Sequence, residues 1–272
     1  MGETPMIAPV TPDLVWFRGP DTIRFLNDLL SQEIALASPG SVLRSLLLDP
    51  QGRLDHILWV LRGDDEVGLL TDPGRGDALA SALGRYRIRV AVDIDASDEP
   101  AWLVVGDRGP GSGGWEKRGE ALIADISWPT LERSLITGVR PDLEEMGAAR
   151  YDTLRIEAGE PRFGVDVDQG TIPQQTGLVG VSVDFEKGCF LGQELVARID
   201  SRGGNVPSRL VRLEFDDGAP DPGATLELEG NEVGTLTSAA GSLGLGMLRR
   251  EVDPGATVEV SDRKALVKEL PG

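Results

Sequence analysis

Cys189, the single cysteine of the chain, lies two positions after Lys187 in a segment whose residue types suit reactive chemistry. The residues that follow, 190–198, have the composition of a helix, and Gly188 permits a sharp turn before them. Cys189 would then lie at the N-terminal end of a helix, beside the Lys187 ammonium. Exposed helical N–H groups and a nearby cation favour a thiolate, which would lower the pKa of Cys189 and make it nucleophilic or metal-binding. The alternative is a buried structural cysteine.

A second candidate is the carboxylate of Glu157. The pattern over 142–159 predicts a helical region that ends at Gly159, so Glu157 would lie in the last turn. The negative end of the helix dipole disfavours a carboxylate there, and no cation lies three or four positions away. An acid placed against local preference is often kept for a ligand, and it can accept two parallel N–H donors from a planar ring edge such as a pterin. The alternative is a solvated surface glutamate.

His56, the single histidine, directly follows Asp55. Any Ser-His-Asp arrangement would have to use it, but the chain has no G-x-S-x-G nucleophile elbow. A half-exposed strand histidine is the alternative. One cysteine and one histidine also exclude an internal disulfide and a multi-histidine metal site, so we predict no resident metal ion.

Hydrophobic spacing predicts the elements that must position these side chains. Apolar residues at helical spacing after Asp21 predict a helix over about 21–36. Strands at 41–48 and 54–61, joined by a Pro/Gly turn, predict a hairpin that carries Asp55 and His56. Strict alternation over 86–94 predicts a half-buried antiparallel strand. Three more strands and a short helix are expected at 67–71, 101–105, 121–126 and 77–84.

The pattern changes after Pro207. Six short strand-like pieces, separated by Pro-Gly, Asn and Gly turns, predict a small all-β barrel or sandwich. We therefore expect an α+β region over 1–206 and a β domain over 207–272. The six pieces are 210–215, 225–229, 232–238, 244–248, 257–260 and 265–269.

Composition excludes several classes of protein. With 272 residues, 40% apolar and 26% charged, the chain is not a disordered one. Its net charge of −18 argues against generic binding to a nucleic-acid backbone. The apolar runs are too short to cross a membrane and the first twelve residues do not resemble a signal peptide, so we expect a cytoplasmic protein with no membrane association.

The segment from Lys187 to Glu194 is similar to the K-G-C-[YF]-x-G-Q-E signature of the YgfZ family. These proteins are folate-binding relatives of the glycine-cleavage T-protein, an aminomethyltransferase. Further matching pieces run in family order over about residues 14–268. They are Leu48 to Arg53, Arg155-x-Glu157-x-Gly159, Pro161 to Gly164, Ile172 to Gln175 and Val233 to Ser238.

The resemblance implies an α+β fold like the T-protein cloverleaf. Two intertwined folate-binding lobes, one of them ferredoxin-like, would be followed by a C-terminal all-β barrel. It also implies that tetrahydrofolate or a derivative binds with Glu157 on the pterin, in a motif that includes Arg155. Asp55 and His56, at the positions of the T-protein aspartate pair, are expected to bind the folate as well. Cys189, with Lys187 beside it, would be the functional cysteine, and we expect its thiolate within reach of the pterin at the mouth of one shared cavity.

The function implied is an accessory role in iron-sulfur cluster assembly or repair, which would support tRNA modification indirectly. Because a cluster needs about four thiolate-type ligands, one cysteine per chain cannot hold it alone. The partners would be the folate and iron-sulfur client or assembly proteins, with no direct nucleic-acid contact.

Two alternatives remain. A folate-dependent aminomethyltransferase or demethylase would carry two aspartates where this chain has Asp55 and His56, and T-proteins lack the cysteine of the K-G-C motif. An imidazole that titrates near pH 6.5 is a poor replacement for a carboxylate, so whether the protein is an enzyme stays open. A module that binds tRNA directly is the other alternative, and the net charge of −18 disfavours it.

Overall fold

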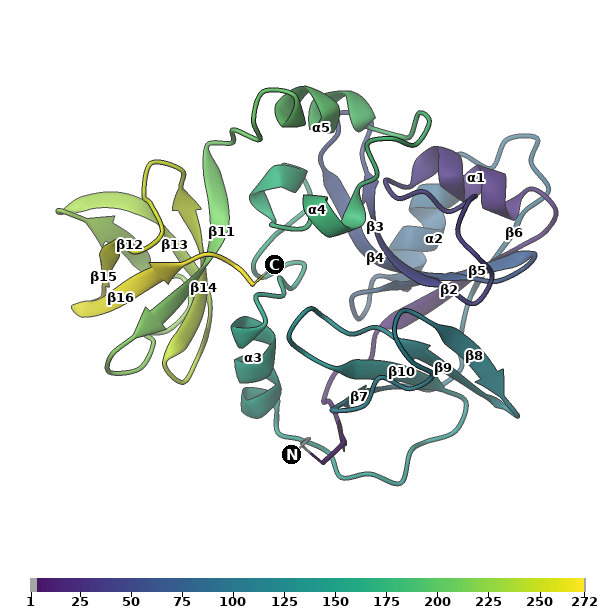
Figure 1. Ribbon diagram of the computed structural model, residues 1–272, viewed down its shortest axis with the longest axis horizontal. Helices are drawn as coiled ribbons and strands as arrows, with labels where there is room; N and C mark the ends of the chain where they lie inside the picture. The colour runs from purple at the N-terminus through teal and green to yellow at the C-terminus, as the bar shows by residue number, and fades with distance from the viewer. Residues whose placement is uncertain (1–3, 272) are drawn as a thin grey trace.

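The computed structural model describes residues 4–271, which form two five-stranded sheets, a closed barrel and a small set of helices. Figure 1 shows three lobes, with the barrel on one side, the two sheets on the other, and helix α3 (Ala148–Glu157) between them. The helices formed by these residues include none with both the length and the apolar composition needed to span a membrane.

The first sheet separates two hydrophobic clusters. Helices α1 (Thr22–Leu29) and α2 (Gly76–Gly84) cover one face, where Val15 and Phe17 are buried. Leu14 and Trp16, which alternate with them on one strand, face the other cluster. The strand order is β3-β4-β5-β2-β6, with β2 at Asp13–Arg18, β3 at Val42–Leu48, β4 at Leu54–Arg62, β5 at Glu66–Thr71 and β6 at Asp93–Ala96.

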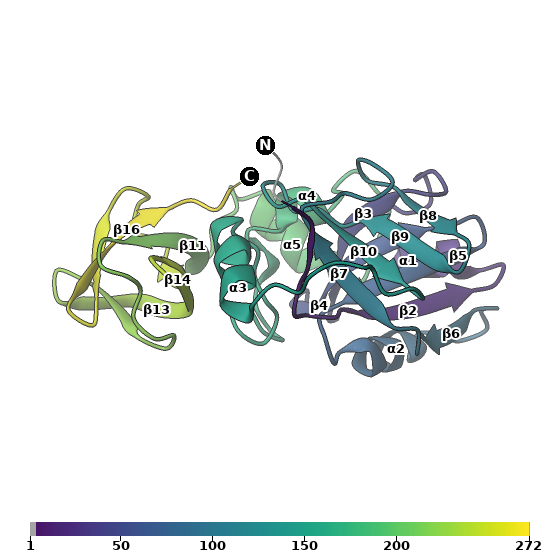
Figure 2. The same cartoon turned by 90° about the horizontal axis from the view of Figure 1, so that it is seen from below.

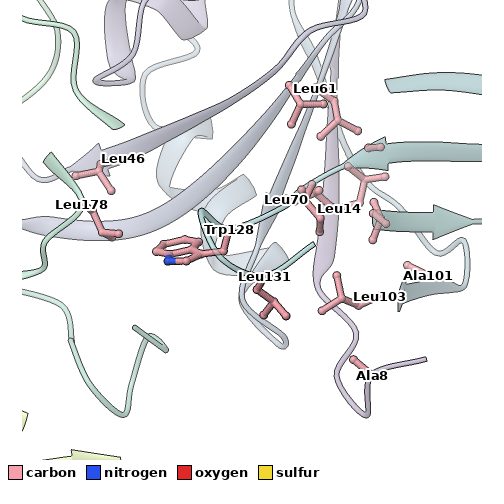
Figure 3. Packing of buried hydrophobic residues seen from close by; sticks show 14 of the residues in the cluster. Ala8, Leu14, Leu46, Leu61, Leu70, Ala101, Leu103, Trp128, Leu131 and Leu178 are labelled. Atoms are coloured by element: carbon pink, nitrogen blue, oxygen red, sulfur yellow. The ribbon is translucent and has the colours of Figure 1, made fainter. Parts of the chain in front are cut away.

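The second sheet packs against the open face of the first. Figure 3 shows Leu14, Leu61 and Leu70 of the first sheet in one cluster with Ala101 and Leu103 of the second. Trp128 lies within this cluster as well. The order is β1-β7-β10-β9-β8, with β1 at Met6–Ile7, β7 at Ala101–Val105, β8 at Trp115–Arg118, β9 at Ala121–Asp125 and β10 at Arg133–Thr137.

All six strands expected after Pro207 are confirmed, and they close into a barrel of order β11-β14-β13-β12-β15-β16. Gly234 permits a close approach of two strands, because a Cβ there would lie 2.2 Å from the carbonyl oxygen of Met247. Figure 2 shows the barrel beside α3, and Ile156 of α3 packs against Leu210 and Leu245 of the barrel. The bounds are β11 Ser208–Phe215, β12 Thr225–Leu228, β13 Asn231–Ala240, β14 Leu243–Arg249, β15 Thr257–Val260 and β16 Arg263–Lys268.

The expected α+β fold with a C-terminal barrel is confirmed, and so is the hairpin at 41–61.

The prediction of a strand over 86–94 is wrong. Strand β6 begins only at Asp93, and residues 86–92 are irregular chain in which the N–H groups of Tyr86 and Arg87 bond to carbonyls at the end of α2. The alternating apolar residues still pack on the helix-covered cluster, but Ile88 is 74% exposed. The alternation there produced no strand pairing before β6, and it did not bury every apolar residue.

Two expected helices are shorter than their patterns. The helix expected over 21–36 ends at Leu29, because Asn27 Oδ1 accepts the N–H groups of Ile34 and Ala35 and turns the chain. The helical region expected from 142 begins at Ala148. Three short elements complete the path to the barrel, namely η1 (Pro173–Gln175), α4 (Val179–Ser182) and α5 (Gln193–Asp200).

Candidate functional site

A cavity of about 510 Å³ lies where β4, β5, the loop after β9 and the chain around α3 meet. Aliphatic, aromatic and charged side chains line it, and a mainly apolar lining with a few polar groups is typical of small-molecule sites. The aromatic members are Trp59, Trp128, Tyr151 and Phe163, and the charged members are Asp72, Arg75, Arg133, Arg155, Glu160 and Arg162.

A buried ion pair between Arg133 and Glu160 forms one charged wall of the cavity. Arg133 is 3% exposed, and its Nη1 donates to Glu160 Oε2 at 2.6 Å and to the Tyr151 hydroxyl at 3.1 Å. Burial acts to lower the pKa of Arg133, but the Glu160 carboxylate outweighs it and holds the pKa above its ordinary value. Burial raises the pKa of Tyr151, so its hydroxyl stays protonated. Glu160 is thus committed to Arg133.

Thr71 and Asp72, at the end of β5, form the second polar wall. Thr71 is 4% exposed, and no residue among 4–271 hydrogen-bonds its Oγ1. Burial, followed by the charge of Glu160, raises the pKa of Asp72 to about 6. The guanidinium of Arg75 lies over the ring of Phe163, with its central carbon 3.9 Å from the ring centroid. The lining of the cavity therefore includes a residue with a buried hydroxyl that is unpartnered in the described chain, Thr71, and a carboxylate, Asp72.

Asp55 and His56 lie side by side on β4 but do not line this cavity. His56 is 1% exposed, and its Nε2 lies 3.4 Å from Arg75 Nη2. Burial, followed by the charge of Arg75, lowers the pKa of His56 to about 4, so the imidazole is neutral near pH 7. Burial raises the pKa of Asp55, whose Oδ1 accepts a hydrogen bond from Gln169. The histidine is buried rather than half-exposed.

Arg155 lines the cavity, whereas Glu157 does not. The Glu157 side chain is exposed, and its backbone carbonyl accepts a hydrogen bond from Arg212. Arg155 is 3% exposed and donates to Asp166 Oδ2 and to Ser238 Oγ, both at 2.8 Å. Its guanidinium therefore ties α3 to β13 of the barrel.

Cys189 is exposed, and it lies outside the cavity lining. Its expected place at a helix N-terminus is wrong, because α5 begins four positions later, at Gln193. The chain before α5 is held irregular by Gly192, which has φ +76°, and by the Phe190 N–H, which donates to Gln193 Oε1. A Cβ on Gly192 would lie 2.5 Å from the carbonyl oxygen of Asp49, so this loop packs directly on the β3–β4 turn. Cys189 therefore precedes α5 and is not one of its first residues.

Lys187 directs its ammonium to backbone oxygens. Its Nζ donates to the carbonyls of Asn27, Leu30 and Gln32 at 2.6, 2.8 and 2.9 Å. Burial lowers the pKa of this amine, and nearby carboxylates oppose the shift. All three ammonium hydrogens are used, so Lys187 fixes the Cys189 segment to the C-terminal end of α1.

Sequence reasoning did not find the residues that define the cavity, which include Thr71, Asp72, Arg133 and Glu160. Asp72 is followed by Pro73 and Gly74, a turn signal at a strand end that could have marked it. No local signal pairs Arg133 with Glu160, because they are 27 residues apart and on different elements.

Comparison with known proteins gives a family match and several relatives. The family model described as CAF17, C-terminal beta-barrel domain, matches residues 208–268. The chain is 32% identical over 274 residues to the iron-sulfur cluster assembly factor IBA57, mitochondrial, of Homo sapiens, covering 88% of this chain and 75% of that protein. It is 25% identical over 304 residues to an aminomethyltransferase of Rubrobacter xylanophilus, covering 94% of this chain and 79% of that protein.

A solved structure shares the fold. The glycine cleavage system aminomethyltransferase T of Bartonella henselae superposes with a TM-score of 0.84 at 21% identity, covering 97% of this chain and 85% of that one. The lobes and the barrel therefore follow the aminomethyltransferase architecture.

Proposed function

The chain belongs to the CAF17/IBA57-like family, and from that premise we propose that it is a tetrahydrofolate-binding accessory protein for iron-sulfur cluster assembly or repair. The cluster role is supported by the human relative named above, and the folate role by the shared aminomethyltransferase fold. The similarity of the segment from Lys187 to Glu194 to the YgfZ signature supports both roles.

The observation that carries the folate proposal is the polar end of the cavity. A pterin is a flat ring with N–H donors along one edge, and the cavity combines aromatic walls with a carboxylate and a buried, unpartnered hydroxyl. Asp72 would accept from the ring edge, Thr71 would bond a ring heteroatom, and Trp59 and Phe163 would flank the ring. These residues fit the group. Glu157, the carboxylate implied by the sequence motif, is exposed and would have to act from outside this lining.

Bound tetrahydrofolate would supply nitrogen atoms that carry a one-carbon unit. The residues of this chain bind and orient it, and the buried Arg133–Glu160 pair keeps the cavity wall charged and fixed. Cys189 contributes an exposed thiol on a surface loop. Because one cysteine cannot complete a cluster site, Cys189 would donate one ligand to a cluster shared with an assembly or client protein. Any effect on tRNA modification is then indirect, through iron-sulfur enzymes.

Folate-dependent aminomethyl transfer is the second candidate, and the shared fold favours it. The residue that replaces the second aspartate, His56, is neutral and lies outside the cavity lining. Incubating the protein with an aminomethyl donor and tetrahydrofolate, and measuring methylene-tetrahydrofolate, distinguishes the two functions. Product formation would establish the transferase.

Thermal stabilisation by tetrahydrofolate tests the binding proposal. A ligand at 100 times its Kd that binds only the native state adds about 2.7 kcal/mol of stability. We expect this shift in the wild type and a clearly smaller one in Asp72→Asn. Glu157→Gln is the matched variant, since it neutralises a carboxylate outside the cavity lining. A shift lost in Glu157→Gln and kept in Asp72→Asn would move the pterin contact to Glu157, and no shift in the wild type would overturn folate binding.

A further inference from the structure

Arg44 lies on β3 directly opposite Trp59 of β4. The central carbon of its guanidinium is 3.6 Å from the ring centroid of Trp128 and 5.1 Å from that of Trp59. The flat cation is thus stacked on Trp128, which is 5% exposed in the centre of the hydrophobic cluster (Figure 3). Stacking fixes the plane of the guanidinium and leaves its edges available for hydrogen bonds.

One nitrogen of this guanidinium is buried and without a hydrogen-bond partner in the part of the chain that the structure describes. The Nη1 of Arg44 is shielded from solvent, and within residues 4–271 no acceptor bonds to it. A buried donor on a charged group without an acceptor costs more than an ordinary lost hydrogen bond, and such groups are rare in native proteins. A ligand that accepts from Arg44 would remove this cost.

Arg44 also lines a second cavity, of about 260 Å³, which shares Trp59 and Trp128 with the main cavity. Arg108 lines it too, although its Nε donates to Glu132 at 3.0 Å. The carboxylate present, Asp125, accepts the N–H groups of Gly113 and Ser127 at 2.9 and 3.0 Å. The unused donor here belongs to a cation, so the complementary ligand group is an anion.

We propose that Arg44 anchors a carboxylate in this second cavity, at the far end of a ligand whose planar ring occupies the main cavity. The inference rests on the proposed function for the identity of the ring, while the carboxylate site stands on Arg44 itself. A carboxylate accepts a charge-assisted hydrogen bond from a guanidinium nitrogen such as Nη1 of Arg44. It has two sources, the glutamyl end of a bound folate or a free glutamyl compound.

Calorimetric titration with four probes tests the proposal. The probes are 6-methyltetrahydropterin, which has the ring alone, p-aminobenzoylglutamate, which has the carboxylates alone, tetrahydrofolate, which has both, and tetrahydrofolate with both carboxyl groups amidated. Loss of a charged hydrogen bond of the usual strength predicts that Arg44→Gln weakens tetrahydrofolate binding by roughly tenfold to a hundredfold. Its binding of 6-methyltetrahydropterin should be unchanged. Arg118→Gln, which removes an exposed arginine outside both cavities, should bind all four probes as the wild type does.

The outcomes separate the two proposals. If no pterin-bearing probe binds the wild type, folate binding fails. Binding of p-aminobenzoylglutamate that depends on Arg44 would then still support the carboxylate site, with the free compound as its source. The carboxylate site is overturned if the diamide binds the wild type as tightly as tetrahydrofolate does. It is also overturned if Arg44→Gln binds both carboxylate-bearing probes with the affinity of the wild type. The diamide comparison uses the wild type, so it decides the question even if Arg44→Gln does not fold.

Discussion

The ammonium nitrogen of Lys187 donates a hydrogen bond of 2.8 Å to the backbone carbonyl of Leu30, 157 positions earlier in the chain. The same nitrogen donates to two further backbone carbonyls, that of Asn27 in the last turn of α1 and that of Gln32 after the helix. One side chain therefore fixes the loop that presents Cys189 to α1, the helix that packs on the first sheet. Lys187 positions the cysteine by holding its loop, through contacts with backbone and not with the thiol.

Lys187→Met should loosen this loop. The variant loses three hydrogen bonds donated by the ammonium, while the methionine side chain keeps part of the apolar packing of the lysine. We expect the free energy of unfolding to fall by about 1 to 3 kcal/mol. Urea unfolding measures the change, and faster cleavage of the 184–192 segment under limited proteolysis locates it. Lys187→Arg, which keeps the charge, should lose less. Equal stability and equal rates of proteolysis in the wild type and Lys187→Met would contradict the role of Lys187 in holding this loop.

Cys189→Ala should separate function from folding. Because the thiol is exposed, its removal is expected to change stability by no more than about 0.5 kcal/mol. The variant should fail to restore iron-sulfur enzyme activity in cells that lack the protein. Native wild-type protein should also react with a thiol reagent at one site per chain. Full rescue by Cys189→Ala would end the cluster-ligand proposal.

Asp72 should make the protein less stable as pH rises. Its pKa is about 6 when folded and near 3.8 ordinarily, so between these values the native state binds more protons than the unfolded chain. The stability from this group is complete below about pH 4 and is lost as pH rises through 6, by up to about 3 kcal/mol. Asp72→Asn should remove this loss. Denaturant unfolding from pH 4 to 7 measures it, and an unchanged slope would refute the assignment.

His56 should act in the opposite direction. Its pKa falls from 6.5 to about 4 on folding, so the unfolded chain binds more protons between these values. Stability is lost as pH falls from about 6.5 towards 4, again by up to about 3 kcal/mol. In the wild type the two groups oppose each other, and His56→Gln should expose the fall caused by Asp72. The substitution also alters packing and so shifts the free energy of unfolding at every pH. The comparison therefore uses the slope of this free energy against pH.

Arg155 should be essential for joining α3 to the barrel. Removing one partner of a buried ion pair typically costs about 3 to 5 kcal/mol, and Arg155→Ala would leave the Asp166 carboxylate buried without its guanidinium. Ser238→Ala, which removes one hydrogen bond of the same group, should cost only about 1 kcal/mol. Thermal unfolding ranks the variants. Similar losses in both would show that the ion pair is not the main contact.

Local spacing could predict the strands that turn residues flank in the sequence. The β3–β4 hairpin and all six barrel strands were predicted because turn residues bound each strand in the sequence. The pairing of β11 with β14 and β16, and of β12 with β15, joins strands that are not consecutive, and local spacing did not predict it. Residues 86–92 alternate in the same way, yet they pack on α2 as turns. In this segment a period of two predicted neither strand pairing nor the burial of every apolar residue, since Ile88 is 74% exposed.

The sequence by itself determined the fold class, the barrel and the segment that carries Cys189. Only the tertiary structure decided what surrounds the candidate residues. It placed Cys189 on an exposed loop, committed Arg155 and Lys187 to structural contacts, and buried His56 as a neutral group. It also assembled the cavity from residues of distant segments such as Asp72 and Glu160. Spacing along a chain records only neighbours within a turn or a strand, whereas burial, charge pairing and cavity shape arise between segments that meet on folding.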